Sequence, residues 1–95
     1  MTISGAMRVS VPAHVLVQEL GGEAVFLNLS AGRYFGLDET STRLWQLLIA
    51  TGSVRGAYDG MLAEYEVEPA RLESDVLAFV AELARRRLLT VTPSK

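Results

Sequence analysis

Two short turns near the start of the chain constrain its fold more than any other feature. Gly21-Gly22 and the tripeptide at 30–32 separate three apolar segments, which cover residues 14–20, 24–29 and 33–37. Glycine supplies the positive φ angles that tight hairpin turns require. Loops this short join antiparallel neighbours, so the sequence predicts a three-stranded antiparallel meander whose edges are its first and third strands.

Three helical patterns follow the meander. Asp38 is placed as an N-cap before the first of them, whose apolar stripe includes Leu44 and Trp45. Gly52 fits the C-cap of this helix, and Ser53 is the expected N-cap of the next. Helix start and stop signals therefore frame the first helix at both ends.

The remaining two helices have weaker boundaries. Gly56 and Gly60 each weaken the second helix by about 1 kcal/mol relative to alanine. Pro69 suits the first turn of a third helix, expected to run to about Arg87, with residues 88–91 extended after it. Three strands followed by three helices predict an α+β domain in a winged helix-turn-helix arrangement.

The composition fits one small cytoplasmic domain. The chain has 95 residues, of which 49% are hydrophobic, and this fraction excludes general disorder. The absence of cysteine excludes disulfides and thiolate chemistry. The N-terminus lacks the features of a signal peptide, and no apolar run approaches the roughly 20 residues that span a bilayer. We therefore expect a soluble protein without a membrane partner.

Residues that carry chemistry are scarce. His14 is the only histidine, and a zinc site needs three or four ligands, so we expect a structural role for it. The chain contains no glycine-rich phosphate-binding motif and no nucleophile elbow, and its serines lack a plausible base. The sequence therefore predicts a protein that is not an enzyme and holds no cofactor or metal.

The charge pattern disfavours nucleic acid as a partner. The chain has 9 basic and 11 acidic residues, whereas binding to phosphate requires a basic face. Arg85, Arg86 and Arg87 form one basic run, which we interpret as positive charge in the last turn of a helix, stabilising by about 0.3–1 kcal/mol per charge. Glu73 and Glu82 on the same helix would repel phosphate. A winged-helix nucleic-acid binder remains the competing class.

The third strand is an aromatic edge without the usual protection. Edge strands are commonly blunted by lysine, proline or a bulge, but this one reads Arg33, Tyr34, Phe35, Gly36. Two interpretations stay open at this point. The aromatic residues can anchor the strand to the helices, or the edge can capture a peptide by strand addition.

Two long runs carry an ordered set of motifs, VFLNLSAGRYFGLDETSTRLWQLL and YEVEPARLESDVLAFVAELARRRLL. A hairpin ends in G-[RK]-Y-[YF]-x-L, an acidic pause precedes an L-W helix, and Y-x-V precedes a helix with D-V-x-x-F. In this order and spacing the motifs resemble the PqqD-like family, recognition elements for the leader peptides of ribosomally synthesised and post-translationally modified peptides. The resemblance covers residues 9–91, as the core of a single domain over residues 1–95.

The resemblance implies a winged helix-turn-helix domain that binds peptide rather than DNA. In this family, the leader of a precursor peptide adds antiparallel to the third strand, in the groove between that strand and the third helix. Here the strand is 33–37, and the helix runs from about 69 to 87. Apolar pockets would accept leader side chains, and two charged residues of the helix would pair with leader charges. The implied peptide-binding residues are Arg33, Tyr34, Phe35, Gly36, Leu37, Arg71, Leu72, Asp75, Val76 and Phe79.

The resemblance also implies partners. A free-standing domain of this kind is most similar to the discrete leader-binding proteins of lasso-peptide biosynthesis. These deliver the precursor to a separate cysteine protease, the leader peptidase, before a cyclase closes the ring. A peptide chaperone for a radical-SAM enzyme, as in pyrroloquinoline quinone biosynthesis, is the alternative. The lasso pathway is our working hypothesis.

Overall fold

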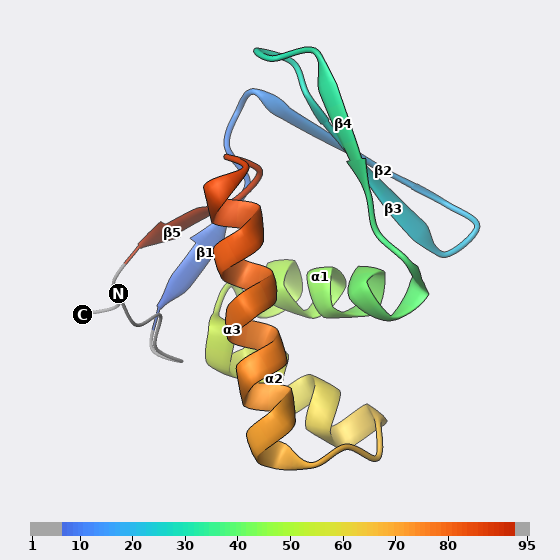
Figure 1. The fold of residues 1–95 in the computed structure, drawn as a ribbon, viewed down its shortest axis with the longest axis vertical. Helices are drawn as coiled ribbons and strands as arrows, with labels where there is room; N and C mark the ends of the chain where they lie inside the picture. The colour runs from blue at the N-terminus through green and yellow to red at the C-terminus, as the bar shows by residue number, and fades with distance from the viewer. Residues whose placement is uncertain (1–6, 93–95) are drawn as a thin grey trace.

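The computed structural model describes residues 7–92, in which four strands precede three helices and a fifth strand follows them (Figure 1). The elements in these residues are β1 (Arg8–Ser10), β2 (Val15–Leu20), β3 (Glu23–Asn28), β4 (Arg33–Gly36), α1 (Glu39–Thr51), α2 (Val54–Glu64), α3 (Pro69–Arg85) and β5 (Thr90–Thr92). An antiparallel sheet followed by three helices confirms the predicted α+β class and winged helix-turn-helix arrangement within this part of the chain.

The meander has the predicted topology. Its strand order is β2-β3-β4, so β4 is an edge of the sheet. In the register between β3 and β4, Phe26 lies opposite Phe35 and Leu27 lies opposite Tyr34. Phe26 is completely buried, whereas Tyr34 is 78% exposed. Because side chains alternate along a strand, Phe35 points to the inner face of the sheet and Tyr34 to the outer face.

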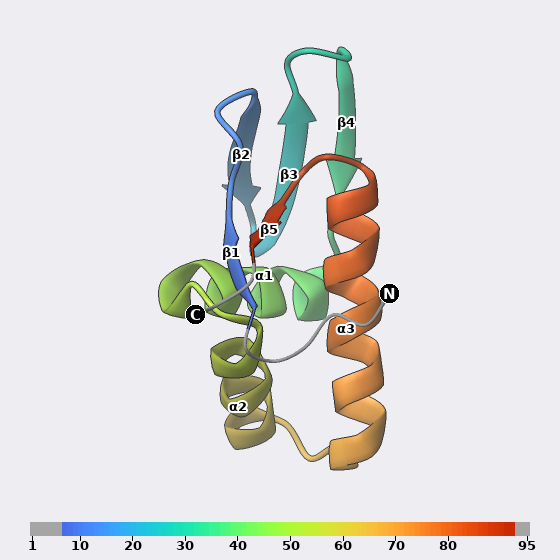
Figure 2. The same ribbon diagram turned by 90° about the vertical axis from the view of Figure 1, so that its left-hand side faces the viewer.

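A second, small sheet was not predicted. β1 pairs antiparallel with β5, with Arg8 opposite Thr92 and Ser10 opposite Thr90. We expected residues 88–91 to be extended, but the strand covers only Thr90–Thr92. The two residues before it, Leu88 and Leu89, are buried in the core. Figures 1 and 2 show β1 and β5 side by side, away from β4. Strands of three residues carry too little alternation to be read from a sequence.

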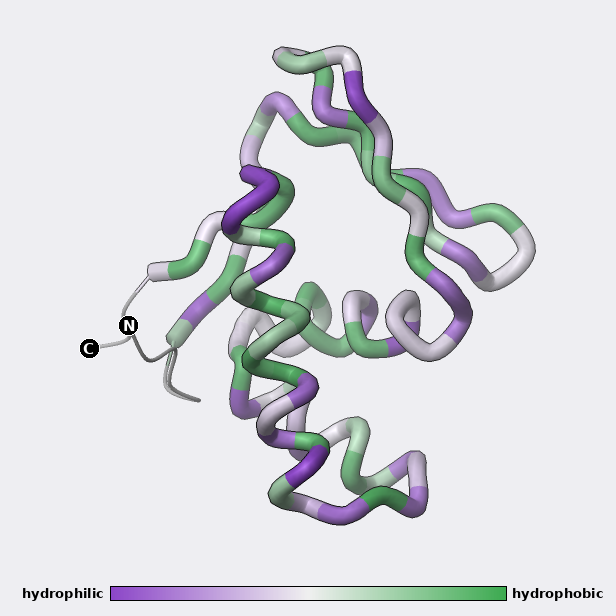
Figure 3. The backbone as a smooth tube through the Cα atoms, in the orientation of Figure 1, coloured by the Kyte–Doolittle hydropathy of each residue, from purple (hydrophilic) through white to green (hydrophobic). Residues whose placement is uncertain are grey.

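The core lies between the meander and the helices, and all three helices contribute buried residues to it. The ring of Phe26 packs edge-on against Trp45, with their centroids 4.7 Å apart. Beside them the hydroxyl of Thr42 accepts a hydrogen bond from the Ala24 N–H at 2.8 Å, which ties α1 to β3. Along α3 hydrophobic and hydrophilic residues alternate, as expected of a helix with one buried side (Figure 3). None of the helices described in residues 7–92 is long and apolar enough to cross a membrane.

The caps of the first two helices form as predicted. Asp38 accepts a hydrogen bond from the Ser41 N–H at 2.8 Å, and this bond holds the pKa of Asp38 below its ordinary value. The Ser53 hydroxyl accepts one from the Gly56 N–H at 2.8 Å. Gly52 ends α1 in the left-handed conformation, with φ at 67°. Local signals in the sequence therefore fix where these helices begin and where α1 ends.

The end of α3 differs from the prediction. The helix was expected to reach Arg87 but ends at Arg85. Leu88 N–H donates to the Leu83 carbonyl and Arg87 N–H donates to the Ala84 carbonyl, which is the hydrogen-bond pattern of a Schellman motif. This motif requires a left-handed residue, and Arg87 takes that place with φ at 60°. Arg86 and Arg87 therefore lie beyond the helix.

The two glycines of α2 have a packing role that the sequence did not reveal. A Cβ added to Gly56 would lie 2.5 Å from the Cβ of Thr51, and one added to Gly60 would lie 2.9 Å from a methyl carbon of Leu47. Both contacts are with α1 or its last residue. The glycines lower the helix propensity of α2 but permit its close approach to α1.

Candidate functional site

A cleft of about 610 Å³ opens between the start of β4 and the end of α3. Both elements present residues to it that are far apart in the sequence. Its charged and aromatic lining consists of Arg33, Tyr34, Phe35, Arg85, Arg86 and Arg87. The cleft thus combines an open strand edge, an aromatic surface and a concentration of positive charge.

Among residues 7–92 no strand pairs with the outer side of β4, so the backbone hydrogen-bonding groups on that side are open. Leu37 N–H donates to the Ala24 carbonyl of β3 at 2.8 Å. In an antiparallel pair, every second residue of a strand hydrogen-bonds to the same neighbouring strand. Phe35, two residues before Leu37, therefore also directs its N–H and carbonyl at β3. Tyr34 and Gly36 direct theirs to the open edge. An incoming strand would therefore pair with these two residues.

One face of α3 looks toward this edge. The guanidinium carbon of Arg86 lies 4.5 Å from the centroid of the Phe35 ring, which fixes the direction of that face. Arg86 caps α3 and its N–H still donates to the Glu82 carbonyl in the helical pattern, so by helical spacing residues 71, 75, 79 and 82 lie on the same side as Arg86. Figures 1 and 2 show that the C-terminal end of α3 is directed toward the sheet, whereas the rest of the helix extends away from it. On α3 the lining of the cleft begins at Arg85, so residues 71, 75 and 79 lie outside it.

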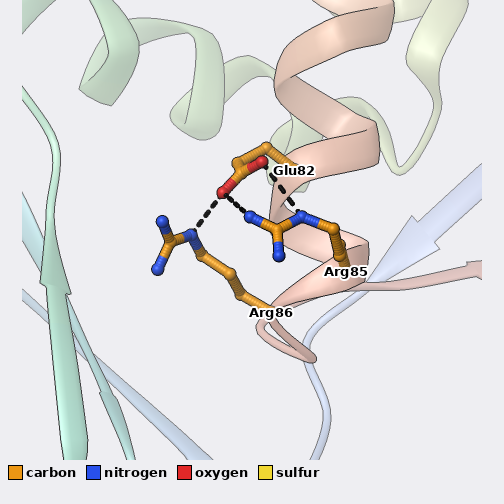
Figure 4. Close-up of polar contacts among 3 residues, drawn as sticks. All are labelled: Glu82, Arg85 and Arg86. Atoms are coloured by element: carbon orange, nitrogen blue, oxygen red, sulfur yellow. Dashed lines mark hydrogen bonds and ion pairs between the residues drawn. The ribbon is translucent and has the colours of Figure 1, made fainter.

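Glu82 organises the arginines at the end of α3 (Figure 4). Its carboxylate lies 2.6 Å from a terminal nitrogen of Arg85 and 2.5 Å from Nε of Arg86. The hydrogen bond from Arg85, followed by that from Arg86, holds the pKa of Glu82 below its ordinary value. Arg85 contacts Glu82 through two nitrogens, whereas Arg86 uses only Nε. In Figure 4 the two terminal nitrogens of Arg86 point away from Glu82.

The strand residues predicted to bind peptide are divided by the structure. Arg33, Tyr34 and Phe35 line the cleft. Gly36 is exposed on the open edge, and nothing lies within 4 Å of a Cβ built on it. Leu37 is only 6% exposed and belongs to the core, so its side chain supports the strand from beneath.

The helix residues predicted to bind peptide lie apart from the cleft. Leu72 and Val76 are 6% and 1% exposed, and both pack in the core, so they do not form the open apolar pockets expected of them. Arg71 and Asp75 are exposed and face each other at 3.9 Å, near the N-terminal end of α3. Phe79 is half-buried and packs against the core, so part of its side chain is exposed.

Sequence reasoning missed the contribution of the arginine run. We interpreted it as charge in the last helical turn, which holds for Arg85 but not for Arg86 and Arg87, because α3 ends before them. The run itself was the available signal, but its role depends on the position of β4 opposite. His14 lies nearby: its Nε2 is 3.1 Å from the Arg87 carbonyl, a structural contact. In residues 7–92 no three His, Asp or Glu side chains gather as a metal site would require.

Comparisons with known proteins identify the family and the fold of this chain. The sequence profile of PqqD, described as coenzyme PQQ synthesis protein D, matches residues 23–89. A solved structure described as TbiB1 in complex with the TbiA(beta) leader peptide is similar, with 34% identity and a TM-score of 0.79, over 83% of this chain and 92% of that one. A lasso peptide synthetase B1 complexed with the leader peptide shares the fold, with 24% identity and a TM-score of 0.79, over 87% of this chain and 98% of that one. No curated protein matched this chain.

Proposed function

This chain belongs to the PqqD family, and from that premise we propose that it binds the leader segment of a ribosomally synthesised precursor peptide by strand addition to β4. The observation that carries the proposal is the open edge of β4, which borders a cleft closed on its other side by the end of α3. The similarity to TbiB1, described in complex with a leader peptide, supports a leader as the guest.

Binding would combine backbone pairing with side-chain contacts. The leader pairs antiparallel with Tyr34 and Gly36, whose backbone groups face the open edge, and this pairing gives affinity without regard to sequence. Phe35 and Phe79 offer aromatic surface to leader side chains on the inner side of the added strand. Arg71 and Asp75 lie farther along the same helix face and meet leader charges there. Leu37, Leu72 and Val76 support these residues from the core.

The protein would act by delivery rather than by chemistry. Leader capture raises the effective concentration of the precursor at an enzyme that associates with this domain. We propose that the enzyme is the leader peptidase of a lasso-peptide pathway in the cytoplasm, with the cyclase acting on the released core. The profile match to coenzyme PQQ synthesis protein D favours one alternative, in which the domain presents its peptide to a radical-SAM enzyme. In both cases residues 1–95 act as one domain without activity of its own.

A titration of labelled leader tests the proposal. The probe is the leader of a short precursor peptide encoded beside this chain, followed by fluorescence anisotropy at two salt concentrations, with the TbiA(beta) leader as a second probe. We expect submicromolar binding that persists at the higher salt. Replacement Gly36→Pro removes an N–H from the open edge and should weaken binding about tenfold, as the loss of a hydrogen bond predicts. Gly36→Ala keeps the N–H and should bind within about twofold of wild type.

Two outcomes would contradict this function. If folded wild-type protein binds neither leader, strand capture is wrong. If it binds duplex DNA instead, with an affinity that falls steeply with salt, the competing nucleic-acid class is correct. The circular dichroism spectrum of Gly36→Pro checks that its sheet is intact; a Cβ at this position has no neighbour within 4 Å.

A further inference from the structure

We propose that Arg33, Arg86 and Arg87 form a carboxylate-binding subsite at the α3 end of the cleft, which selects leaders that carry an aspartate or glutamate at that point. The inference rests on the proposed function and adds to it the chemistry of one leader residue. Three features of the described residues support it: the charge of the cleft, the geometry of Arg86 and the backbone of Arg87.

Positive charge is concentrated at this cleft although the chain as a whole is acidic. The net charge is -2, yet four of the 9 basic residues line the cleft and no acidic residue lines it. Outside the cleft, three of the four arginines are each paired with one carboxylate, namely Arg43 with Glu64, Arg55 with Asp59 and Arg71 with Asp75. Arg85 and Arg86 share the single carboxylate of Glu82. Among residues 7–92 no ion pair engages Arg33 or Arg87. The four arginines of the cleft therefore carry more positive charge than the carboxylate of Glu82 can balance.

Arg86 is already oriented for a guest. Glu82 holds its Nε, and the ring of Phe35 lies 4.5 Å beneath its guanidinium carbon. The two terminal nitrogens remain on the side away from Glu82 (Figure 4). A guanidinium fixed in this way loses little side-chain freedom when it binds a second carboxylate, and it can do so through both terminal nitrogens.

Arg87 occupies a backbone position that favours glycine. It is the left-handed residue of the Schellman motif that ends α3, with φ at 60°, and a side chain with a Cβ is disfavoured there. The chain accepts this strain at a residue that lines the cleft. Strained positions are concentrated at ligand-binding sites, where the side chain compensates for its cost to the fold.

The cleft is continuous with the open edge of β4, so the carboxylate belongs to a paired peptide rather than to a separate anion. An antiparallel guest runs opposite to β4, and Arg33 is the first residue of that strand. The carboxyl end of the guest segment therefore lies nearest Arg33 and the end of α3. We place the acidic residue at the carboxyl end of the bound leader segment, on the side of the core peptide.

Arg87→Gly separates binding from folding. Glycine relieves the backbone strain, so the variant should melt at a higher temperature than wild type. Its affinity for the labelled leader of the precursor peptide encoded beside this chain should fall about fivefold to tenfold. This is the loss expected for a charge-assisted contact that is partly exposed to water. Arg86→Gln should show a similar loss. Arg55→Gln, which removes one exposed arginine on α2, is the charge-matched control and should bind within about twofold of wild type.

Leader variants identify the partner of these arginines. Each Asp and Glu of the leader is changed in turn to Asn or Gln, and binding is measured with wild type and with Arg86→Gln. One replacement near the carboxyl end should weaken binding to wild type and have little further effect on Arg86→Gln. A leader without an acidic residue there, or equal losses for Arg87→Gly and Arg55→Gln, would overturn the subsite. Failure of wild type to bind the leader would instead overturn the proposed function.

Discussion

Thr42 joins the sheet to the helices through one buried hydrogen bond. Its side chain is 1% exposed, and its hydroxyl accepts from the Ala24 N–H at 2.8 Å. The Ala24 carbonyl accepts in turn from the Leu37 N–H, the residue that follows β4. A single threonine therefore satisfies a buried backbone donor at the position where β3, β4 and α1 meet.

Replacement of this threonine by valine tests the bond without changing the shape of the side chain. We expect Thr42→Val to lower the free energy of unfolding by about 1–3 kcal/mol, because the buried Ala24 N–H loses its acceptor. Urea denaturation followed by circular dichroism measures the change. The control is Thr40→Val, at an exposed position two residues earlier on α1. Equal stability of the two variants would mean that Ala24 finds another partner.

At the scale of elements, contact between α1 and α2 depends on glycine. Alanine at position 56 would raise the helix propensity by about 1 kcal/mol, but its Cβ would overlap Thr51. We expect Gly56→Ala to destabilise the protein by about 1–3 kcal/mol, as overpacking does. Gly60→Ala meets only the flexible end of Leu47 and should cost less. Urea midpoints of the two variants give the comparison; a more stable Gly56→Ala would show that the helices can separate without cost.

Sequence signals of local origin predicted the elements well. Each of these signals acts within a few residues, so the element boundaries could be predicted from the sequence. They are the turn at Gly21-Gly22, the caps at Asp38 and Ser53, and the proline at the start of α3. The edge position of β4 followed from the same turns. For the candidate site, this reasoning and the family resemblance indicated the strand and the helix that border the groove.

Features that depend on distant residues could not be predicted in the same way. β1 and β5 pair with each other although they lie near opposite ends of the sequence. Each strand is too short for its alternation of apolar and polar residues to be recognised. Periodicity placed Leu72 and Val76 in the apolar stripe of α3. It could not show that this stripe is buried in the core and takes no part in the cleft. The role of Arg86 depends on Phe35, which approaches it only in the folded protein.

At the scale of the whole molecule, three carboxylates make stability depend on pH. Hydrogen bonds from Ser41, Arg43 and Arg85 hold the pKa values of Asp38, Glu64 and Glu82, in that order, below the ordinary values of 3.8 for Asp and 4.5 for Glu. A carboxylate with a lowered pKa in the folded state stabilises the fold above its unfolded pKa. This contribution is lost as the pH falls through the folded value.

Acid titration of stability checks this behaviour. The wild-type urea midpoint should fall between about pH 6 and pH 3. The triple variant Asp38→Asn, Glu64→Gln, Glu82→Gln should fall less, because it no longer has these three ionisations. Asparagine keeps an acceptor for the α1 cap, so the variant should fold at both pH values. Parallel curves for the two proteins would assign acid sensitivity to other carboxylates.

The pairing of β1 with β5 has a consequence for how such a domain can be joined to others. Arg8 lies opposite Thr92, so the described chain enters and leaves the fold at one place. In Figure 1 this place lies on the other side of α3 from β4. A polypeptide fused ahead of β1 or after β5 would therefore be attached at the same site of this domain, on the other side of α3 from β4.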